Sequence, residues 1–430
     1  MHVFFSGIGG TAISSLALIA YEAGYEVSGS DARPSGYLKY LKEHGISDTH
    51  IGVDRDFIAA VHAQNPIDWY VYGSAQPMDF PDHPEFEFCK QNSIKMSKRD
   101  EFLSKLIQDK GMQLIAVAGT HGKTTTTAMA TWAFKKLGIP LSYSGGAKLS
   151  FGDVGEFDPK SKYFVYEADE YDRNFLSFYP EIALISGIDY DHQDIYPTRE
   201  SYEEAFLEFF EQSNKVVLWH DDVERLGIDA EPKYDILDKN DAGGGLIKLA
   251  GAVNRENAWL VANGLSKELS QPVDTLVEIL NDFPGVSRRF ERISDNIYTD
   301  SAHTPPKIRG ALQLAHEVAG DNVVVVYEGL HNTRQHFIKD ELATLFDSVK
   351  NLYIVPSYLA REDKSLELLT PEKLLKLISV QARRKAAAAQ LNEDLRKIIN
   401  HHAEQGDLVL CLSAGGAGSL DEWLRQNFTE

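Results

Sequence analysis

Residues 116–127, AVAGTHGKTTTT, restrict the possible fold more than any other segment of the chain. A hydrophobic run ends at a glycine, a second glycine follows after two residues, and a lysine and threonines then lead into a segment of helical character. Such a strand, loop and helix can bind phosphate, because glycines let backbone N–H groups approach and a helix N-terminus attracts anions. The segment therefore predicts a nucleotide-binding loop formed by Gly119, Thr120, His121, Gly122, Lys123, Thr124 and Thr125.

The expected ligands of this loop are ATP and Mg²⁺. Lys123 has the position of a lysine that contacts the β- and γ-phosphates, and Thr124 has the position of a hydroxyl that holds Mg²⁺. Val117 departs from the GxxxxGKT pattern, because it replaces the first glycine. The lysine, the hydroxyls and the preceding strand are in register, so the loop predicts an ATP-consuming enzyme.

Composition and charge exclude several classes of protein. The 430 residues are enough for two to four domains, and no apolar run reaches the length needed to span a bilayer. A strand-like run begins at Val3, which leaves no room for a signal peptide, so we expect a cytoplasmic protein. Cys89 and Cys411 have no CxxC partner, and the net charge of −21 argues against nucleic-acid binding. The sequence does not predict an oligomeric state.

The chain divides into three sections, in each of which hydrophobic runs alternate with helical segments. This alternation predicts an α/β protein with parallel sheets covered on both faces. We expect a Rossmann-like domain over residues 1–109, a phosphate-loop domain over 110–285 and a second Rossmann-like domain over 286–430. The polar segment IQDKGMQ is the expected linker between the first two domains, and the second ends near Pro284 and Gly285.

A second glycine-rich segment lies in the first section. Residues 7–12, GIGGTA, approximate GxGxxG, and Asp31 ends the next strand-like run, EVSGSD. Glycines at this spacing can admit a diphosphate to a helix N-terminus, and the acid can accept from ribose hydroxyls. The pattern leaves three alternatives open: a nucleotide diphosphate other than NAD, NAD(P), or a glycine turn without a ligand.

Acidic residues follow a later apolar strand. Residues 167–170, Glu-Ala-Asp-Glu, come directly after YFVY, so their carboxylates should lie at the edge of the sheet where the nucleotide binds. Carboxylate oxygens suit Mg²⁺, and Glu167 is the expected ligand. His192, after the strand IALISGI, is a second candidate ligand, although a lone loop histidine more often forms only hydrogen bonds.

Seven segments in order resemble the Mur ligase family, the ATP-dependent amide-forming enzymes of peptidoglycan precursor synthesis. They are GIGGTAISSLA with GSD, AVAGTHGKTTT, EADEYDRNFL, IDYDHQDIY, NRENA, FPGVSRRFE and DSAHTP. The resemblance implies that Glu167 and His192 hold a second Mg²⁺, that Asn257 lies near adenine, that Arg289 meets the γ-phosphate on domain closure and that Asp300 binds the ATP ribose. His303 lies in the same loop as Asp300, and we expect it or His192 to be the base that takes the acceptor proton.

The resemblance also implies the substrates. The first domain is similar to the pocket for UDP-N-acetylmuramate, with expected contacts from Gly7, Ile8, Gly9, Gly10, Thr11, Asp31 and Ser74. The branch that adds L-alanine is the most similar one: Thr333 and Arg334 match its acceptor motif, whereas the His-Arg pair that precedes them in that motif is absent. The expected amino-acid contacts are Thr333 and Arg334, with His331 beside them. The implied reaction forms an acyl phosphate on the lactyl carboxylate, which the amino group of L-alanine then attacks to give an amide.

Some residues at the acceptor site favour another branch. Glu328, Asn332 and Thr333, with the segment LSAGGAGSL, are more similar to the recycling ligase that attaches a tripeptide, L-Ala-γ-D-Glu-diaminopimelate, to UDP-N-acetylmuramate. That branch typically carries an insertion after its EADEYD motif which this chain lacks, and Val253 replaces the histidine that usually precedes Asn254. Outside the family, an NAD(P)-dependent oxidoreductase would leave the phosphate loop without a task, and a nucleotide switch or motor would leave the first glycine segment unexplained.

Overall fold

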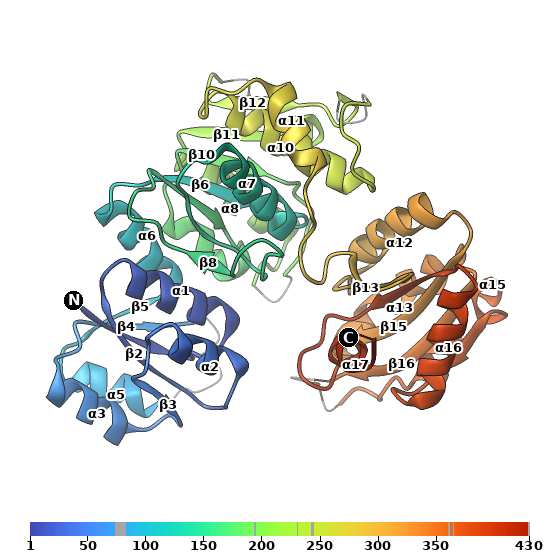
Figure 1. The fold of residues 1–430 in the computed structure, drawn as a ribbon, viewed down its shortest axis with the longest axis horizontal. Coiled ribbons are helices and arrows are strands. Elements are labelled where there is room, and N and C mark those ends of the chain that lie inside the picture. The colour runs from blue at the N-terminus through green and yellow to red at the C-terminus, as the bar shows by residue number, and fades with distance from the viewer. Residues whose placement is uncertain are drawn as a thin grey trace. The chain divides into compact units, whose positions relative to one another are not determined.

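A computed structural model describes residues 1–73, 83–192, 195–229, 231–241, 245–359, 362–363 and 365–428 (Figure 1). Three sheets form in chain order, each flanked by helices, which confirms the predicted α/β fold class. Within these ranges, no helix is both long enough and apolar enough to cross a membrane.

The first sheet has five parallel strands in the order β3-β2-β1-β4-β5. The strands are β1 (His2–Ser6), β2 (Glu26–Asp31), β3 (Thr49–Ile51), β4 (Trp69–Tyr72) and β5 (Lys95–Lys98). The connecting helices are α1 (Thr11–Glu22), α2 (Gly36–Glu43), α3 (Arg55–Gln64), α5 (Pro84–Gln91) and α6 (Arg99–Asp109). β1 is buried along its whole length, as expected for the central strand of a covered parallel sheet.

The second sheet has the order β12-β11-β10-β6-β9-β7-β8. Its strands are β6 (Gln113–Ala118), β7 (Ser142–Ser144), β8 (Gly155–Glu156), β9 (Tyr163–Glu167), β10 (Ile182–Ile185), β11 (Lys215–Trp219) and β12 (Tyr234–Leu237). The helical segments are α7 (Lys123–Leu137), η1 (Tyr171–Ser177), α8 (Arg199–Glu211), α9 (His220–Leu226), α10 (Ala252–Ser266) and α11 (Val273–Asn281). The strands pair in parallel except for β7 and β8, an antiparallel pair at one edge that the sequence did not predict.

The third sheet has the order β13-β14-β18-β15-β16-β17. Its strands are β13 (Glu291–Ser294), β14 (Ile297–Asp300), β15 (Val323–Leu330), β16 (Asn351–Tyr358), β17 (Ala386–Ala388) and β18 (Leu408–Leu412). The helices are α12 (Pro305–Ala319), α13 (Asn332–Leu345), α14 (Pro371–Leu377), α15 (Val380–Arg383), α16 (Glu393–Glu404) and α17 (Leu420–Phe428). β13 and β14 form a second antiparallel edge.

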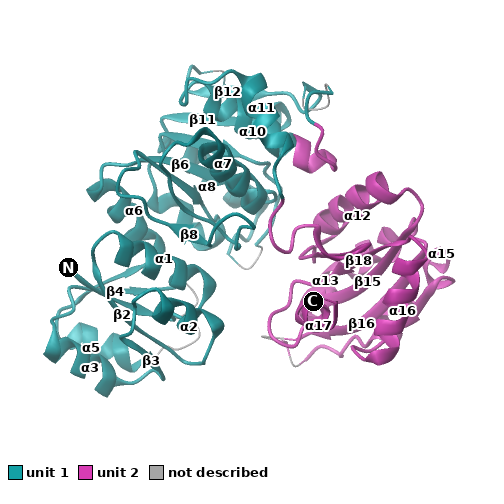
Figure 2. Cartoon of the chain, viewed as in Figure 1, with its two compact units in different colours: residues 1–247, 256–284 teal, residues 248–255, 285–430 magenta. Residues whose placement is uncertain are grey.

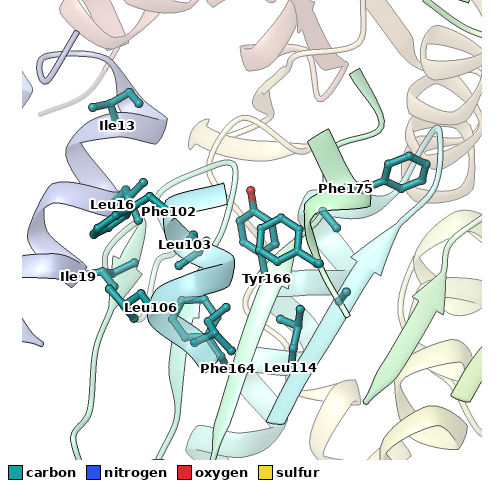
Figure 3. Packing of buried hydrophobic residues seen from close by; sticks show 14 of the residues in the cluster. Ile13, Leu16, Ile19, Phe102, Leu103, Leu106, Leu114, Phe164, Tyr166 and Phe175 are labelled. Carbon is teal, nitrogen blue, oxygen red and sulfur yellow. The ribbon is translucent and has the colours of Figure 1, made fainter. Parts of the chain in front are cut away.

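The chain forms two compact units (Figure 2). Unit 1 contains residues 1–247 and 256–284, and unit 2 contains residues 248–255 and 285–430. One hydrophobic core serves both sheets of unit 1: side chains from α1 and α6 pack against β6, β9 and η1 (Figure 3). The two sheets of unit 1 therefore share one continuous cluster of buried side chains.

The expected linker IQDKGMQ is shorter than predicted. Its first three residues belong to α6, and Ile107 is buried in the shared core. Only residues 110–112 separate α6 from β6. The segment is mostly polar, so its composition did not indicate that α6 continues to Asp109 or that Ile107 packs into the core.

Candidate active site

The phosphate loop joins β6 to α7, as the sequence predicts. Gly119 and Gly122 have φ values of +133° and +83°, which L-residues with a side chain rarely adopt. A Cβ atom on Gly122 would also lie 2.8 Å from Oδ1 of Asn257, so this position requires glycine for a second reason. The contact brings Asn257, on α10, next to the loop.

Thr120 is an anchor of this loop. Its N–H donates to the carbonyl of Gly187 at 2.8 Å, and its hydroxyl donates to the carbonyl of Asp189 at 2.6 Å. The same hydroxyl lies 2.7 Å from that of Tyr202. The Thr120 side chain is buried, and both its hydroxyl and its N–H bind protein atoms, so Thr120 fixes the loop to the segment after β10.

Lys123 begins α7 and binds two acceptors. Its Nζ donates to the carbonyl of Gly119 at 2.7 Å and to Oε2 of Glu170 at 2.5 Å. Glu170 is 1% exposed, and burial alone would raise its pKa. The adjacent Lys123 charge and the hydrogen bonds from His192 and Lys123 outweigh burial and hold the pKa of Glu170 at about 2. The sequence placed Glu170 within the acidic cluster, but no spacing rule identified it as the partner of the lysine.

Glu167, at the end of β9, lies opposite Thr124. The Thr124 hydroxyl donates to Oε1 of Glu167 at 3.0 Å, and the Gly146 N–H donates to Oε2 at 2.8 Å. A Cβ atom on Gly146 would lie 2.7 Å from both carboxylate oxygens. Among the described residues, no three or more His, Cys, Asp or Glu side chains group to hold a metal ion. The pair fits Mg²⁺, which usually binds one or two protein oxygens together with phosphate and water.

His192 faces Glu170. Its Nε2 lies 3.5 Å from Oε1 of Glu170, and its φ is +58°. Burial lowers the pKa of His192, but the hydrogen bond to Glu170 and the charges of Asp191 and Glu170 give a net increase. A metal-bound imidazole must be neutral, so binding an ion through Nδ1 would require His192 to lose its extra proton, while Nε2–H could still donate to Glu170.

A cavity of about 160 Å³ lies beside Glu167. Ala12 and Leu16 of α1 line one side, and residues of the β7 and β9 ends line another. Arg99 also lines it, and its guanidinium pairs with Asp100 at 3.0 Å and with Asp169 at 3.6 Å. The cavity therefore reaches from the helix after the first glycine segment to the acids beside the phosphate loop.

The first glycine segment folds as predicted, but its N–H groups have internal acceptors. Those of Gly7 and Ile8 donate to the carbonyl of Ser30, and that of Gly9 donates to the Asp31 carboxylate at 2.8 Å. Gly10 donates to the carbonyl of Gly7 at 3.0 Å. The first N–H groups of α1, beginning at Thr11, have no intrahelical acceptor by helix geometry and are the donors suited to an anion.

Ile8 and Asp31, two residues expected to contact the UDP-sugar, also have contacts within the protein. The Ile8 side chain is buried in the core, so a contact with a ligand would have to come from its backbone. Asp31 accepts from the N–H groups of Gly9 and Arg33, which makes it a support of the glycine turn. Ser74 lies outside the described residues.

Two expected nucleotide contacts, Arg289 and Asp300, lie in unit 2, around the end of β14. Asp300 accepts from the N–H groups of Phe290 at 2.8 Å and Ala302 at 2.7 Å, and burial raises its pKa. Arg289 donates to the carbonyl of Arg288 at 3.0 Å and to the Ser301 hydroxyl.

His303 is a weak base in this setting. Its Nδ1 lies 2.7 Å from the carbonyl of Ser301, an arrangement that keeps the ring proton on Nδ1. Burial, then the nearby charge of Lys307, lowers the pKa of His303 to about 3, and Arg334 and Arg289 add to this. The surrounding cations favour an anionic ligand, and they argue against His303 as acceptor of the substrate proton.

At the expected acceptor site, the Glu328 carboxylate forms two hydrogen bonds within the protein. One oxygen accepts from the Ser413 hydroxyl at 2.6 Å and the other from the Leu420 N–H at 2.9 Å. Glu328 is buried and connects β15 to Ser413, which follows β18, and to Leu420, which begins α17. Its departure from the alanine-adding pattern therefore has a structural cause. Asn332 is also buried and binds the backbone of Glu367 and Leu369.

His331 and Thr333 both approach Glu362. His331, with φ at +57°, has its Nδ1 3.7 Å from Oε1 of Glu362. The N–H of Thr333 donates to Oε2 of Glu362 at 3.0 Å. Arg334 lies on the first turn of α13, beside them in sequence, and its charge reaches His303. The sequence did not identify Glu362, which follows β16.

Family models match most of the chain. Residues 2–110 match the Mur ligase family catalytic domain, residues 117–244 the Mur ligase middle domain, and residues 288–415 the Mur ligase glutamate ligase domain.

Individual proteins match over nearly their full length. A UDP-N-acetylmuramate–L-alanine ligase from Myxococcus xanthus is 30% identical, covering 96% of this chain and 92% of that protein. One from Clostridium acetobutylicum is 29% identical, covering 98% and 96%. A solved UDP-N-acetylmuramate-alanine ligase from Thermotoga maritima has a TM-score of 0.74 at 23% identity, covering 99% of this chain and 98% of that one. A murein peptide ligase from Psychrobacter arcticus has a TM-score of 0.64 at 22% identity, covering 100% and 98%. The chain belongs to the Mur ligase family.

Proposed function

We propose that this chain joins L-alanine to the lactyl carboxylate of UDP-N-acetylmuramate, with ATP as the energy source, in the synthesis of peptidoglycan precursors. The observation that carries the proposal is the cavity that reaches from α1 to Glu167 beside the phosphate loop. Such a cavity can bring a sugar acid, whose diphosphate lies at the N-terminus of α1, to the γ-phosphate. The relatives named as alanine ligases support the choice of substrates.

The first chemical step is transfer of the γ-phosphate. A lactyl carboxylate oxygen attacks γ-phosphorus, the bond to the β,γ-bridging oxygen breaks, and ADP leaves. Lys123 stabilises the charge on the transferring group, and Thr124 and Glu167 would hold Mg²⁺, which supplies positive charge to the phosphates. His192 is proposed as a further metal ligand and Asn257 as a neighbour of adenine.

The second step forms the amide. The amino group of L-alanine attacks the acyl carbon of the acyl phosphate, a proton leaves the nitrogen, and inorganic phosphate departs. We assign the L-alanine carboxylate to Arg334, with His331 and Thr333 beside it, and we assign Arg289 and Asp300 to the nucleotide. Residues 1–109 would then bind the UDP-sugar, 110–285 ATP, and 286–430 the amino acid.

A phosphate-release assay tests this function. Purified protein is mixed with MgATP and UDP-N-acetylmuramate, and L-alanine, glycine, L-serine or L-Ala-γ-D-Glu-diaminopimelate is added. We expect the fastest release with L-alanine and no release without the UDP-sugar. Lys123→Ala is the control for contaminating activity, and its kcat should fall on the order of 10³-fold. Faster release with the tripeptide would assign the chain to the murein peptide ligases instead.

A further inference from the structure

Glu170 has contacts that the reaction steps above do not use. Its Oε2 lies 2.5 Å from Nζ of Lys123, and its Oε1 lies 3.5 Å from Nε2 of His192. One buried carboxylate therefore contacts both the cation of the phosphate loop and a proposed metal ligand.

A second set of side chains fixes Glu170. The Tyr202 hydroxyl lies 3.5 Å from Oε1 of Glu170 and 2.7 Å from the Thr120 hydroxyl, so it links the acid to the phosphate loop. The Tyr196 hydroxyl donates to the carbonyl of Glu170 at 2.5 Å. Both tyrosines are buried. Hydrogen-bonding groups therefore contact both the side chain and the backbone of Glu170.

This arrangement has two opposite effects on Lys123. An ammonium group has three N–H donors, and two of them bind the carbonyl of Gly119 and the carboxylate of Glu170. The third remains for a phosphate oxygen, and the other two bonds fix its direction. The negative charge of Glu170 also repels an incoming triphosphate and competes with it for the lysine.

We propose that Glu170 is a positioning residue that fixes Lys123 and His192 for phosphate transfer and, through its charge, weakens the binding of ATP. The inference rests on the proposed ATP-dependent function. It predicts that removing the charge changes ATP affinity and turnover in opposite directions, which loss of structural support would not do.

The test compares Glu170→Gln with Glu170→Asp and with Glu208→Gln. Glu208 is a matched control, because it is 51% exposed and its partner is Arg173 on the surface of the same unit. Equilibrium binding of MgATP is measured by calorimetry without the UDP-sugar, and kcat is measured with all substrates. For Glu170→Gln, we expect the Kd for ATP to fall about threefold or more and kcat to fall at least about tenfold.

Glu170→Asp separates charge from position. It keeps the charge on a shorter side chain, so we expect an almost unchanged Kd and a lower kcat. Glu208→Gln should change neither quantity. Weaker ATP binding in Glu170→Gln together with lower kcat would indicate a purely structural role and would overturn the inference, as would no change in either. If Glu170→Gln does not fold, weaker ATP binding by Glu170→Asp overturns it and an unchanged Kd with reduced kcat supports it. Failure of the wild-type protein to bind ATP would instead reject the proposed function.

Discussion

At the scale of single residues, the acids after β9 differ in their partners. Glu167 accepts from Thr124 and Gly146, Asp169 faces Arg99 at 3.6 Å, and Glu170 binds Lys123. The three carboxylates therefore have different partners, although they stand within four consecutive positions. Single substitutions should therefore have separable effects.

Glu167→Gln should raise the Mg²⁺ concentration needed for activity. A neutral amide oxygen binds Mg²⁺ more weakly than a carboxylate, and we expect a half-saturating Mg²⁺ concentration on the order of tenfold higher. Gly146→Ala is a matched change, because its Cβ would displace the same carboxylate without altering its charge. Kinetics over a Mg²⁺ titration measure both variants. Wild-type Mg²⁺ dependence in both would mean that Glu167 has no part in metal binding.

Arg334→Lys should raise the KM for L-alanine and leave the KM for UDP-N-acetylmuramate nearly unchanged. A guanidinium can bind a carboxylate through two parallel hydrogen bonds, and an ammonium cannot reproduce that geometry. We expect an increase in KM on the order of tenfold, measured by steady-state kinetics with each substrate varied in turn. An equal effect on both substrates would place Arg334 away from the acceptor.

At the scale of secondary structure, α1 and β8 form a closely packed junction in unit 1. A Cβ atom on Gly155 would overlap the Ser15 hydroxyl, would lie 2.9 Å from Cδ1 of Ile19 and would lie 3.0 Å from the carbonyl of Tyr143. The N–H of Phe157 donates to Glu22, at the end of α1, at 2.8 Å. This junction joins the helix after the first glycine segment to the sheet that carries the phosphate loop.

Gly155→Ala should therefore destabilise unit 1. Overpacking of this kind costs about 1–3 kcal/mol, because neighbouring side chains and backbone must move. Unfolding in urea would measure the change in the free energy of unfolding. The double variant Gly155→Ala with Ser15→Gly should recover part of the loss, because it removes the Ser15 hydroxyl that the new methyl group would otherwise meet. A single variant as stable as wild type would show that α1 can shift away from β8.

The sequence predicted the elements of this site better than their contacts. Hydrophobic runs, most of them followed by glycines, identified β1, β6, β9, β10, β15 and β18, because a buried parallel strand is recognisable from local composition. The partners of Glu170 and Glu328 were not predictable, because each depends on side chains far away in the chain. The contacts of Asp31 were also not predicted: its oxygens accept from the backbone N–H groups of Gly9 and Arg33.

At the scale of the whole molecule, each unit has a core of its own. The core of unit 1 joins its two sheets, and the two clusters in unit 2 pack against opposite faces of the third sheet with residues from 290–428. A protein built in this way can unfold in more than one step.

We expect the stability of unit 2 to fall as the pH decreases below about 6.5, through His303. The pKa of this imidazole is lowered to about 3 from 6.5, chiefly by burial, so the unfolded chain takes up a proton over a range in which the folded one does not. The slope cannot exceed about 1.4 kcal/mol per pH unit for one group. Calorimetry at several pH values would measure it, and His303→Gln should reduce the slope for the transition of unit 2. An equal slope in the variant would assign the pH dependence to other groups.

The junction between α1 and β8 also matters for exchanging parts between related enzymes. A side chain at position 155 would meet the Ser15 hydroxyl, so the residues that position 155 accepts depend on the residue at position 15. A chimaera that takes its first sheet from one parent and its second from another would bring together two surfaces that had never been matched. We expect such hybrids to fold well only when α1 and the β7–β8 hairpin are inherited together.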